Sequence, residues 1–151
     1  MIAVVQRVSS AVVRVDGKIT GECKNGLMIL LGVENGDNEK HADTLAAKLS
    51  KLRIFKDEND KMNLSVLDVG GSAVVVSNFT LNADYKKGNR PNYLGGAEPD
   101  EANRLYEYFS NSLRACGLHV ENGIFGADME CSIVNDGPVT LVIDSKILVK
   151  Q

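Results

Sequence analysis

Leu27-Met-Ile-Leu-Leu-Gly-Val33 is the stretch of this 151-residue chain that decides its fold, because it contains no polar side chain. A strand that is buried on both faces has such a continuous apolar run, whereas a strand with one wet face alternates apolar and polar residues. Turn-forming triplets, Lys24-Asn-Gly26 and Glu34-Asn-Gly36, bound the run on both sides. The sequence therefore predicts a central, buried strand over residues 27–33.

Shorter β-type segments lie on both sides of this central strand. Ile2 to Val8 and Ala11 to Val15 predict two strands before it, and Asp16-Gly17 predicts a hairpin turn after the second. Three apolar runs downstream predict further strands: Ala73 to Leu81, Glu130 to Val134 and Val139 to Asp144. Residues 135–138 are expected to form the turn between the last two.

Two segments have the period of an amphipathic helix. In the first, Asp37 is placed to cap the helix, and the apolar positions are Ala42, Leu45, Ala46, Leu49 and Leu52. The second begins at Pro99, stops at Gly117 and turns five apolar side chains inward: Ala102, Leu105, Tyr106, Phe109 and Leu113.

Strands that arrive in pairs around single helices argue against a regular doubly wound parallel sheet. The chain length favours one domain, and no linker rich in Pro, Gly or Ser divides it. We therefore expect a single α/β domain over residues 1–151, with a mixed, largely antiparallel sheet or a barrel-like β core and two main helices.

The composition excludes several classes of protein. The formal net charge is −3, so contact with RNA would need a local basic patch. Three cysteines without a C-x-x-C pair argue against a zinc site or a disulfide framework. No apolar run reaches the roughly 18 residues of a membrane span, and polar and charged residues come too early for a secretory leader. We expect a cytoplasmic protein without a membrane segment.

Common catalytic machinery is scarce. A nucleophilic triad needs a base, usually histidine, and the chain has only His41 and His119. His41 falls near the start of the first helix and His119 at the start of a strand, where ordinary surface histidines are expected. No Gly-rich phosphate-binding motif is present. The residues predict neither a metal site nor a cofactor.

Two segments place polar groups where a site could form. Ser77-Asn-Phe-Thr80 ends a Val-rich buried strand, a common position for a site, although the hydroxyls could equally bond the local backbone. Asn135-Asp-Gly-Pro-Val-Thr140 has the composition of a turn between strands. It also contains Gly137, which leaves the preceding carbonyl groups unshielded by any side chain.

A third segment, residues 84–93, combines positive charge with aromatic rings. Lys86, Lys87 and Arg90 suit phosphates, and Tyr85 and Tyr93 suit stacked bases. A solvated basic loop is the alternative interpretation.

Together these segments resemble the D-aminoacyl-tRNA deacylase family over almost the whole chain. Two of them match its signature motifs, Ser-Gln-Phe-Thr at residues 77–80 and Gly-Pro-Val-Thr at 137–140. The other matching stretches are residues 6–8, 26–27, 31–33, 52–55, 62–65, 87–91 and 125–129. Position 78 departs from the pattern, because Asn78 stands where the family usually has Gln, and Tyr93 stands where Phe is common.

The resemblance implies hydrolysis of the ester between a D-amino acid, or glycine, and the 3′-terminal adenosine of tRNA. It implies a homodimer without a cofactor, with two sites at the subunit interface and a cis bond between Gly137 and Pro138. Main-chain carbonyls of this pair would enter the partner's site and leave no room for an L side chain.

The resemblance also implies the roles of the other site residues. Ser77 and Asn78 would help to shape the adenosine and ester site, and the Phe79 N–H and the Thr80 hydroxyl would orient or polarise the ester. The substrate's own 2′-hydroxyl would assist the reaction, which explains the missing base. Lys86, Lys87 and Arg90 would meet acceptor-stem phosphates.

Two alternatives stay open on the sequence. A non-catalytic module that binds RNA 3′ ends would need only the basic aromatic segment. A general esterase would use Thr80 or Ser77 as its nucleophile and would act on small esters.

Overall fold

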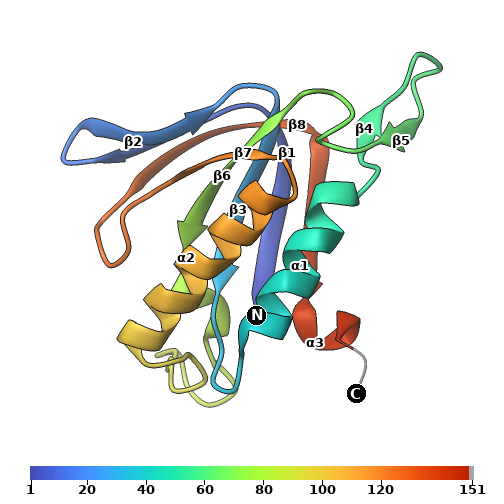
Figure 1. The fold of residues 1–151 in the computed structure, drawn as a ribbon. Coiled ribbons are helices and arrows are strands. Elements are labelled where there is room, and N and C mark those ends of the chain that lie inside the picture. Colours follow the sequence, from blue (N-terminus) through green and yellow to red (C-terminus); the bar gives the residue numbers. More distant parts are fainter. Residues whose placement is uncertain (150–151) are drawn as a thin grey trace.

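The structure, a computed structural model, describes residues 1–149. A six-stranded sheet forms its centre, and two long helices cover one face of that sheet (Figure 1). The strands are β1 (Ile2–Val15), β2 (Lys18–Cys23), β3 (Gly26–Gly32), β4 (Phe55–Lys56), β5 (Met62–Leu64), β6 (Ser72–Ser77), β7 (His119–Asn122) and β8 (Glu130–Asp144). The helices are α1 (Glu39–Lys51), the 3-10 helix η1 (Phe79–Asn82), α2 (Pro99–Ala115) and the short α3 (Ser145–Leu148).

β3 lies in the middle of the sheet, as its apolar sequence predicts. The strand order is β2-β1-β3-β6-β7, and β8 also pairs with β1. β1 pairs antiparallel with β2, β3 and β8, whereas β6 runs parallel to both β3 and β7. The expected mixed sheet with two main helices is confirmed.

Two long strands replace the pairs of shorter strands that the sequence predicts. β1 runs through Ser9 and Ser10, and a register shift between Val8 and Ser10 lets it continue as one strand. β8 likewise runs through residues 135–138, which were expected to form a turn. Residues 136–139 lie opposite the single β1 residue Arg7, so they bulge out of the ladder instead of reversing the chain.

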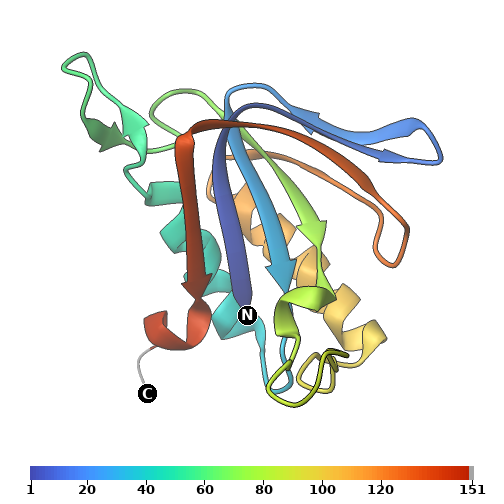
Figure 2. The ribbon, with the colours of Figure 1, turned by 180° about the vertical axis from the view of Figure 1, so that it is seen from behind.

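The sheet has a buried cluster on each face. On one face, α1 and α2 cover a large cluster that includes Val5 and Phe109, both 0% exposed. On the other face, the second half of β1, β2 and the first half of β8 curl over β3 and β6 and bury Met28 and Val74. No helix of residues 1–149 covers the strands on that second face (Figure 2). The curled sheet is therefore barrel-like but leaves part of its outer face open.

The start of α1 differs from the prediction. Asn38, and not Asp37, caps the helix, and His41 Nδ1 accepts a hydrogen bond from the Asn38 N–H at 3.2 Å. The buried carboxylate of Asp37 instead accepts a hydrogen bond from the α-ammonium group of Met1 at 2.7 Å. A buried charge is costly without a partner, so the Asp37 carboxylate pairs with the buried α-ammonium group rather than capping the helix.

The second helix agrees with the prediction. Pro99 is its first residue, and the chain leaves it at Gly117, whose φ of +97° is accessible to glycine. Within residues 1–149, we find no helix that is both long and apolar enough to cross a membrane.

Candidate active site

The chain leaves β6 at Ser77 and turns into η1, where the sequence predicts further strand up to Leu81. Asn78 fixes this turn. Its N–H donates to Leu31 O at 2.9 Å, and its Oδ1 accepts from the N–H and the hydroxyl of Thr80, at 3.3 and 2.5 Å. Because the Thr80 N–H can only donate, the atom that it meets is the amide oxygen. The NH2 group of Asn78 therefore points away from Thr80.

Phe79 begins η1 and presents a free hydrogen-bond donor. The first N–H groups of a helix have no partner within it, and the Phe79 N–H donates to no other atom of residues 1–149. The Phe79 side chain is 62% exposed and meets the Tyr93 ring edge-on, with 5.0 Å between the ring centroids. The strand end thus combines an unpaired donor with an aromatic pair.

A cavity of about 730 Å³ opens beside this strand end. Ser77, Asn78 and Phe79 line it, while Thr80 lies just outside. The rest of its wall is mostly apolar and comes from β3, β6, the start of β8, the loop before β8 and the segment that leads into α2. A cavity of this size and character is typical of a site for a small organic ligand.

The cavity offers few groups for acid–base or nucleophilic chemistry. Among its lining residues in the described part of the chain, Asp128 is the only carboxylate and histidine is absent. Burial raises the pKa of the Cys131 thiol, which keeps this lining group protonated and a poor nucleophile at neutral pH. Thr80 has Asn78 beside it rather than a base. The site is not organised for attack by a protein nucleophile.

Arg7 holds the bulge of β8 from beneath. This side chain is 4% exposed, and its Nε lies 3.1 Å from Asp136 Oδ2 and donates to Asp136 O at 3.2 Å. Its Nη1 donates to Ile54 O at 2.7 Å. The buried guanidinium therefore joins the bulge to the segment that follows α1.

Gly137 and Pro138 lie exposed at the crest of this bulge. Asn135 Nδ2 donates to Arg7 O and to Val139 O, both at 3.0 Å, and so closes the base of the bulge. Gly137 has a φ of +131°, and a Cβ on it would lie 2.9 Å from Val139 N and 3.0 Å from Arg7 Nη2. Only glycine fits this position. The Gly137–Pro138 peptide bond is cis, as the resemblance implies.

The cavity and the bulge are separate within one chain. Ser77 aligns with Leu31 and hence with Ala3 of β1, whereas the bulge lies opposite Arg7. The two segments are thus about 13 Å apart along β1 and about 14 Å apart across the three strand spacings from β6 to β8. Neither Gly137 nor Pro138 lines the cavity.

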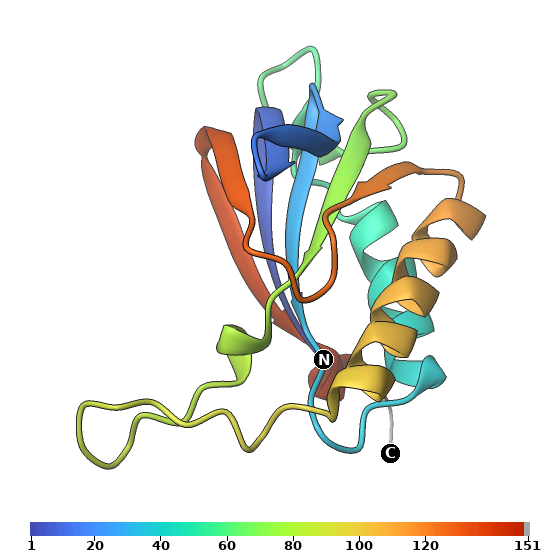
Figure 3. The ribbon, with the colours of Figure 1, turned by 90° about the vertical axis from the view of Figure 1, so that its left-hand side faces the viewer.

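The third predicted segment belongs to a projection that we call the arm, residues 83–96. Figure 3 shows it extending away from the sheet beyond η1. Lys86, Lys87 and Arg90 lie exposed on it, and its end at Tyr93 and Gly96 forms part of the cavity wall. The structure therefore places the cations outside the cavity but on a segment joined to it.

A family model for D-Tyr-tRNA(Tyr) deacylase matches residues 4–144, a range that includes both the strand end and the bulge. The chain belongs to the D-Tyr-tRNA(Tyr) deacylase family. A curated relative named D-aminoacyl-tRNA deacylase from Koribacter versatilis (strain Ellin345) is 54% identical over 97% of this chain and 98% of its own length. One of the same name from Ruegeria pomeroyi (strain ATCC 700808 / DSM 15171 / DSS-3) is 55% identical over 95% and 99%.

Solved structures share the fold of this deacylase family member. A structure described as "c-Myc DNA Unwinding Element Binding Protein" matches with a TM-score of 0.89 and 36% identity, over 95% of this chain and 98% of that chain. A second, described as "Structural Analysis of a probable eukaryotic D-amino acid tRNA deacylase", matches with a TM-score of 0.81 over 94% and 97%. Its identity is only 14%, so it shows the fold alone.

Sequence reasoning missed the side chains that support the two deacylase segments. Arg7 interrupts an apolar run in β1, and a charge at such a position is a signal for a buried, partnered group. Tyr93 was assigned only to base stacking in a loop, yet it packs against Phe79 at the cavity. Cys131 carries no sequence signal for its place in the wall, because the curl of β8 brings it there.

Proposed function

We propose that this chain hydrolyses the ester between a D-amino acid and the 3′-terminal adenosine of tRNA. Its relatives are named for this activity, and the chain covers nearly all of their length. The observation that carries the proposal is the strand end at the cavity, where the Phe79 N–H is unpaired. A site with a free backbone donor and no protein nucleophile suits an ester that brings its own assisting group.

The cavity would hold the terminal adenosine and the ester. Ser77 and Asn78 line it and shape the nucleoside site, while the rings of Phe79 and Tyr93 offer a surface against which a base can pack. The Phe79 N–H would donate to the carbonyl oxygen as negative charge develops on it. Thr80, through its bond to Asn78, would orient the site rather than attack the ester.

The ribose would supply the group that the protein lacks. A 2′-hydroxyl beside the 3′-ester lies within reach of the carbonyl carbon or of an attacking water, so positioning alone yields a large rate gain. Histidine, metal and cofactor chemistry have no place in this scheme.

Chiral selection would come from a second copy of the chain. Gly137 and Pro138 lie on an exposed bulge too far from their own cavity to act there, and so the proposal assigns them to the partner's cavity in a homodimer. Their carbonyls would accept from the substrate's α-ammonium group and occupy the space of an L side chain. Glycine has no side chain to exclude, so glycyl-tRNA is also a proposed substrate.

The open face of the sheet supports such a dimer. Val142, Val4 and Leu30 lie side by side on it, Val142 is 72% exposed, and Leu30 also lines the cavity. A second copy seated on this row would reach the cavity mouth, and it would bury an apolar surface that is open in one chain.

The arm and the overall charge fit an RNA end. Lys86, Lys87 and Arg90 would meet phosphates of the acceptor end, while the net charge of −3 limits indiscriminate binding to RNA. We place the protein in the cytoplasm, where its tRNA substrate is charged.

The decisive assay compares ester loss from D-tyrosyl-tRNA and L-tyrosyl-tRNA at equal concentration. We expect turnover of the D ester and preservation of the L ester. Binding without turnover would instead support a non-catalytic RNA 3′-end binding module, and equal turnover of both esters would exclude the chiral gate.

The source of the assisting group is tested on a terminal ribose without its 2′-hydroxyl. We expect D-tyrosyl-tRNA that ends in 2′-deoxyadenosine to resist hydrolysis while still competing for the site. Continued hydrolysis, together with activity on small esters, would favour a general esterase that uses Thr80 or Ser77.

A further inference from the structure

The arm is an ordered part of the structure and not a loose loop. Asp84 and Asn92 exchange two backbone hydrogen bonds of 2.8 and 2.9 Å, and the Lys86 N–H donates to Asp84 Oδ1 at 3.0 Å. At the base of the arm, Asn35 Nδ2 donates to Leu94 O at 2.9 Å. A ligand would thus meet a surface whose conformation is already restrained, which lowers the entropy cost of binding.

The cations of the arm are free to pair with a ligand. Lys86, Lys87 and Arg90 form no ion pair with any residue in the described range 1–149. Asp84 is the arm's only acidic residue, and its carboxylate is engaged by the Lys86 N–H. A chain with a net negative charge thus carries a locally positive projection next to its cavity.

An aromatic ring lies among these cations. The ring of Tyr85 is 76% exposed, and the side chain of Leu94, at the base of the arm, is 84% exposed. In a duplex, the bases are already stacked on one another and offer no face to such a ring, whereas an unpaired base can stack on it. The ring therefore favours single-stranded RNA over a helical stem.

The reach of the arm sets which nucleotides it meets. Tyr93 and Gly96 line the cavity, so the base of the arm adjoins the place proposed for the terminal adenosine. From Asn92 to the turn at Gly88, the chain extends at most about 13 Å. The cations lie within the span of a few nucleotides from the cavity.

On this basis we propose that the arm binds the unpaired nucleotides that precede the 3′-terminal adenosine. Tyr85 stacks on one base, and Lys86, Lys87 and Arg90 pair with the adjoining phosphates. The inference rests on the proposed function, because the cavity must hold the terminal adenosine. It differs from contact with the acceptor stem in that no helical RNA is needed.

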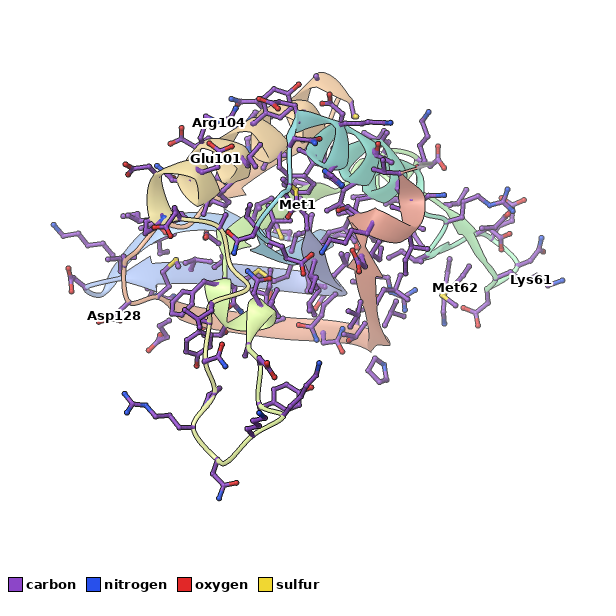
Figure 4. The ribbon with its side chains drawn as sticks, turned by 90° about the horizontal axis from the view of Figure 1, so that it is seen from below. Met1, Lys61, Met62, Glu101, Arg104 and Asp128 are labelled. Carbon is purple, nitrogen blue, oxygen red and sulfur yellow. The ribbon has the colours of Figure 1, made fainter. Side chains whose placement is uncertain are left out.

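Three D-tyrosyl esters separate these contacts: D-tyrosyl-adenosine, a short single-stranded oligoribonucleotide that ends in CCA-D-tyrosine, and complete D-tyrosyl-tRNA. The variants are Lys87→Glu, Tyr85→Ala and Tyr85→Phe. Lys61→Glu is the matched control, since Figure 4 shows Lys61 on the β4-β5 hairpin, far from the arm.

For the oligoribonucleotide and for the tRNA, we expect Lys87→Glu and Tyr85→Ala each to lower kcat/KM about tenfold, with Tyr85→Phe close to the wild type. For D-tyrosyl-adenosine, all variants should match the wild type, which also shows that they fold. Lys61→Glu should change none of the three.

A loss confined to complete tRNA would place the contact on the stem and overturn the inference. An equal loss on D-tyrosyl-adenosine, or no loss on any ester, would overturn it as well. Failure of the wild type to hydrolyse any of the D esters would refute the proposed function itself, so the two failures are distinguishable.

Discussion

Asn78 Oδ1 accepts both the backbone N–H and the hydroxyl of Thr80, so these two side chains form one unit at the end of β6. The family usually has Gln at position 78, and the shorter Asn meets Thr80 within its own turn. The Thr80 hydroxyl therefore donates its hydrogen to Asn78 and not to a base.

This relationship predicts a small effect of removing the Thr80 hydroxyl. Thr80→Val should lower kcat on D-tyrosyl-tRNA by less than about tenfold, because the variant keeps the backbone N–H of position 80, which still donates to Asn78 Oδ1. Thr80→Ser should match the wild type. Single-turnover kinetics measure both, and a loss of about a thousandfold or more in the Val variant would identify Thr80 as a nucleophile.

Arg7 should control the bulge that carries Gly137 and Pro138. Arg7→Lys keeps a charge but cannot reach Asp136 and Ile54 together, so we expect a loss of about 2 kcal/mol in the free energy of unfolding. L-tyrosyl-tRNA should then be hydrolysed as well. Arg14→Lys, on the same strand, is the control for denaturation and for the L-ester assay. Intact L rejection in Arg7→Lys would show that Arg7 does not position the gate.

Cys131 offers a chemical test of the cavity. Burial raises the pKa of its thiol, so at pH 8 it should react with iodoacetamide more slowly than a free thiol, and its rate should rise about tenfold per pH unit up to that raised pKa. A D-aminoacyl-adenosine analogue with an amide link should slow the reaction at Cys131. Cys116 caps the C-terminal end of α2, does not line the cavity and should show no protection. Mass spectrometry follows both thiols, and equal protection of both would argue against ligand binding in this cavity.

The open sheet face should mediate dimer formation. Val142→Lys places a charge in the exposed apolar row, and we expect it to yield monomers in sedimentation experiments and to lose chiral selection. Ile147→Lys on α3 is the control, because Ile147 is also highly exposed, at 83%, but lies outside the row. A dimeric Val142→Lys protein would exclude this face as the interface.

The sequence predicted well those parts of the fold that depend on local patterns. The apolar run at residues 27–33 became the central strand, and the period around Leu45 and Leu105 became α1 and α2. Turn chemistry was less informative where tertiary pairing decided the outcome. Residues 135–138 have turn composition, yet β1 pairs with both flanks and keeps them in one strand.

The candidate site was only partly predictable for the same reason. The strand end at Ser77 and Asn78 was found from local pattern, and it lies at the cavity. The walls supplied by Leu30 and Cys131 come together through the curl of the sheet, which no short segment encodes. Asp37 was predicted to cap α1, but its carboxylate binds the α-ammonium group of Met1 instead. That contact depends on how the N-terminus packs.

Subunit complementation tests the two-chain active site most directly. Gly137→Ala impairs the bulge but leaves its own cavity intact, whereas Ala127→Trp fills the cavity and leaves the bulge intact. With its gate impaired and its cavity intact, the Gly137→Ala protein should hydrolyse L-tyrosyl-tRNA as well as D-tyrosyl-tRNA. When an equal amount of Ala127→Trp protein exchanges with it, half of the intact cavities gain a partner with an intact bulge, so the rate on L-tyrosyl-tRNA should fall to about half. Mixed dimers that form but leave the rate on L-tyrosyl-tRNA unchanged would contradict a site built from the cavity of one chain and the Gly137–Pro138 segment of the other.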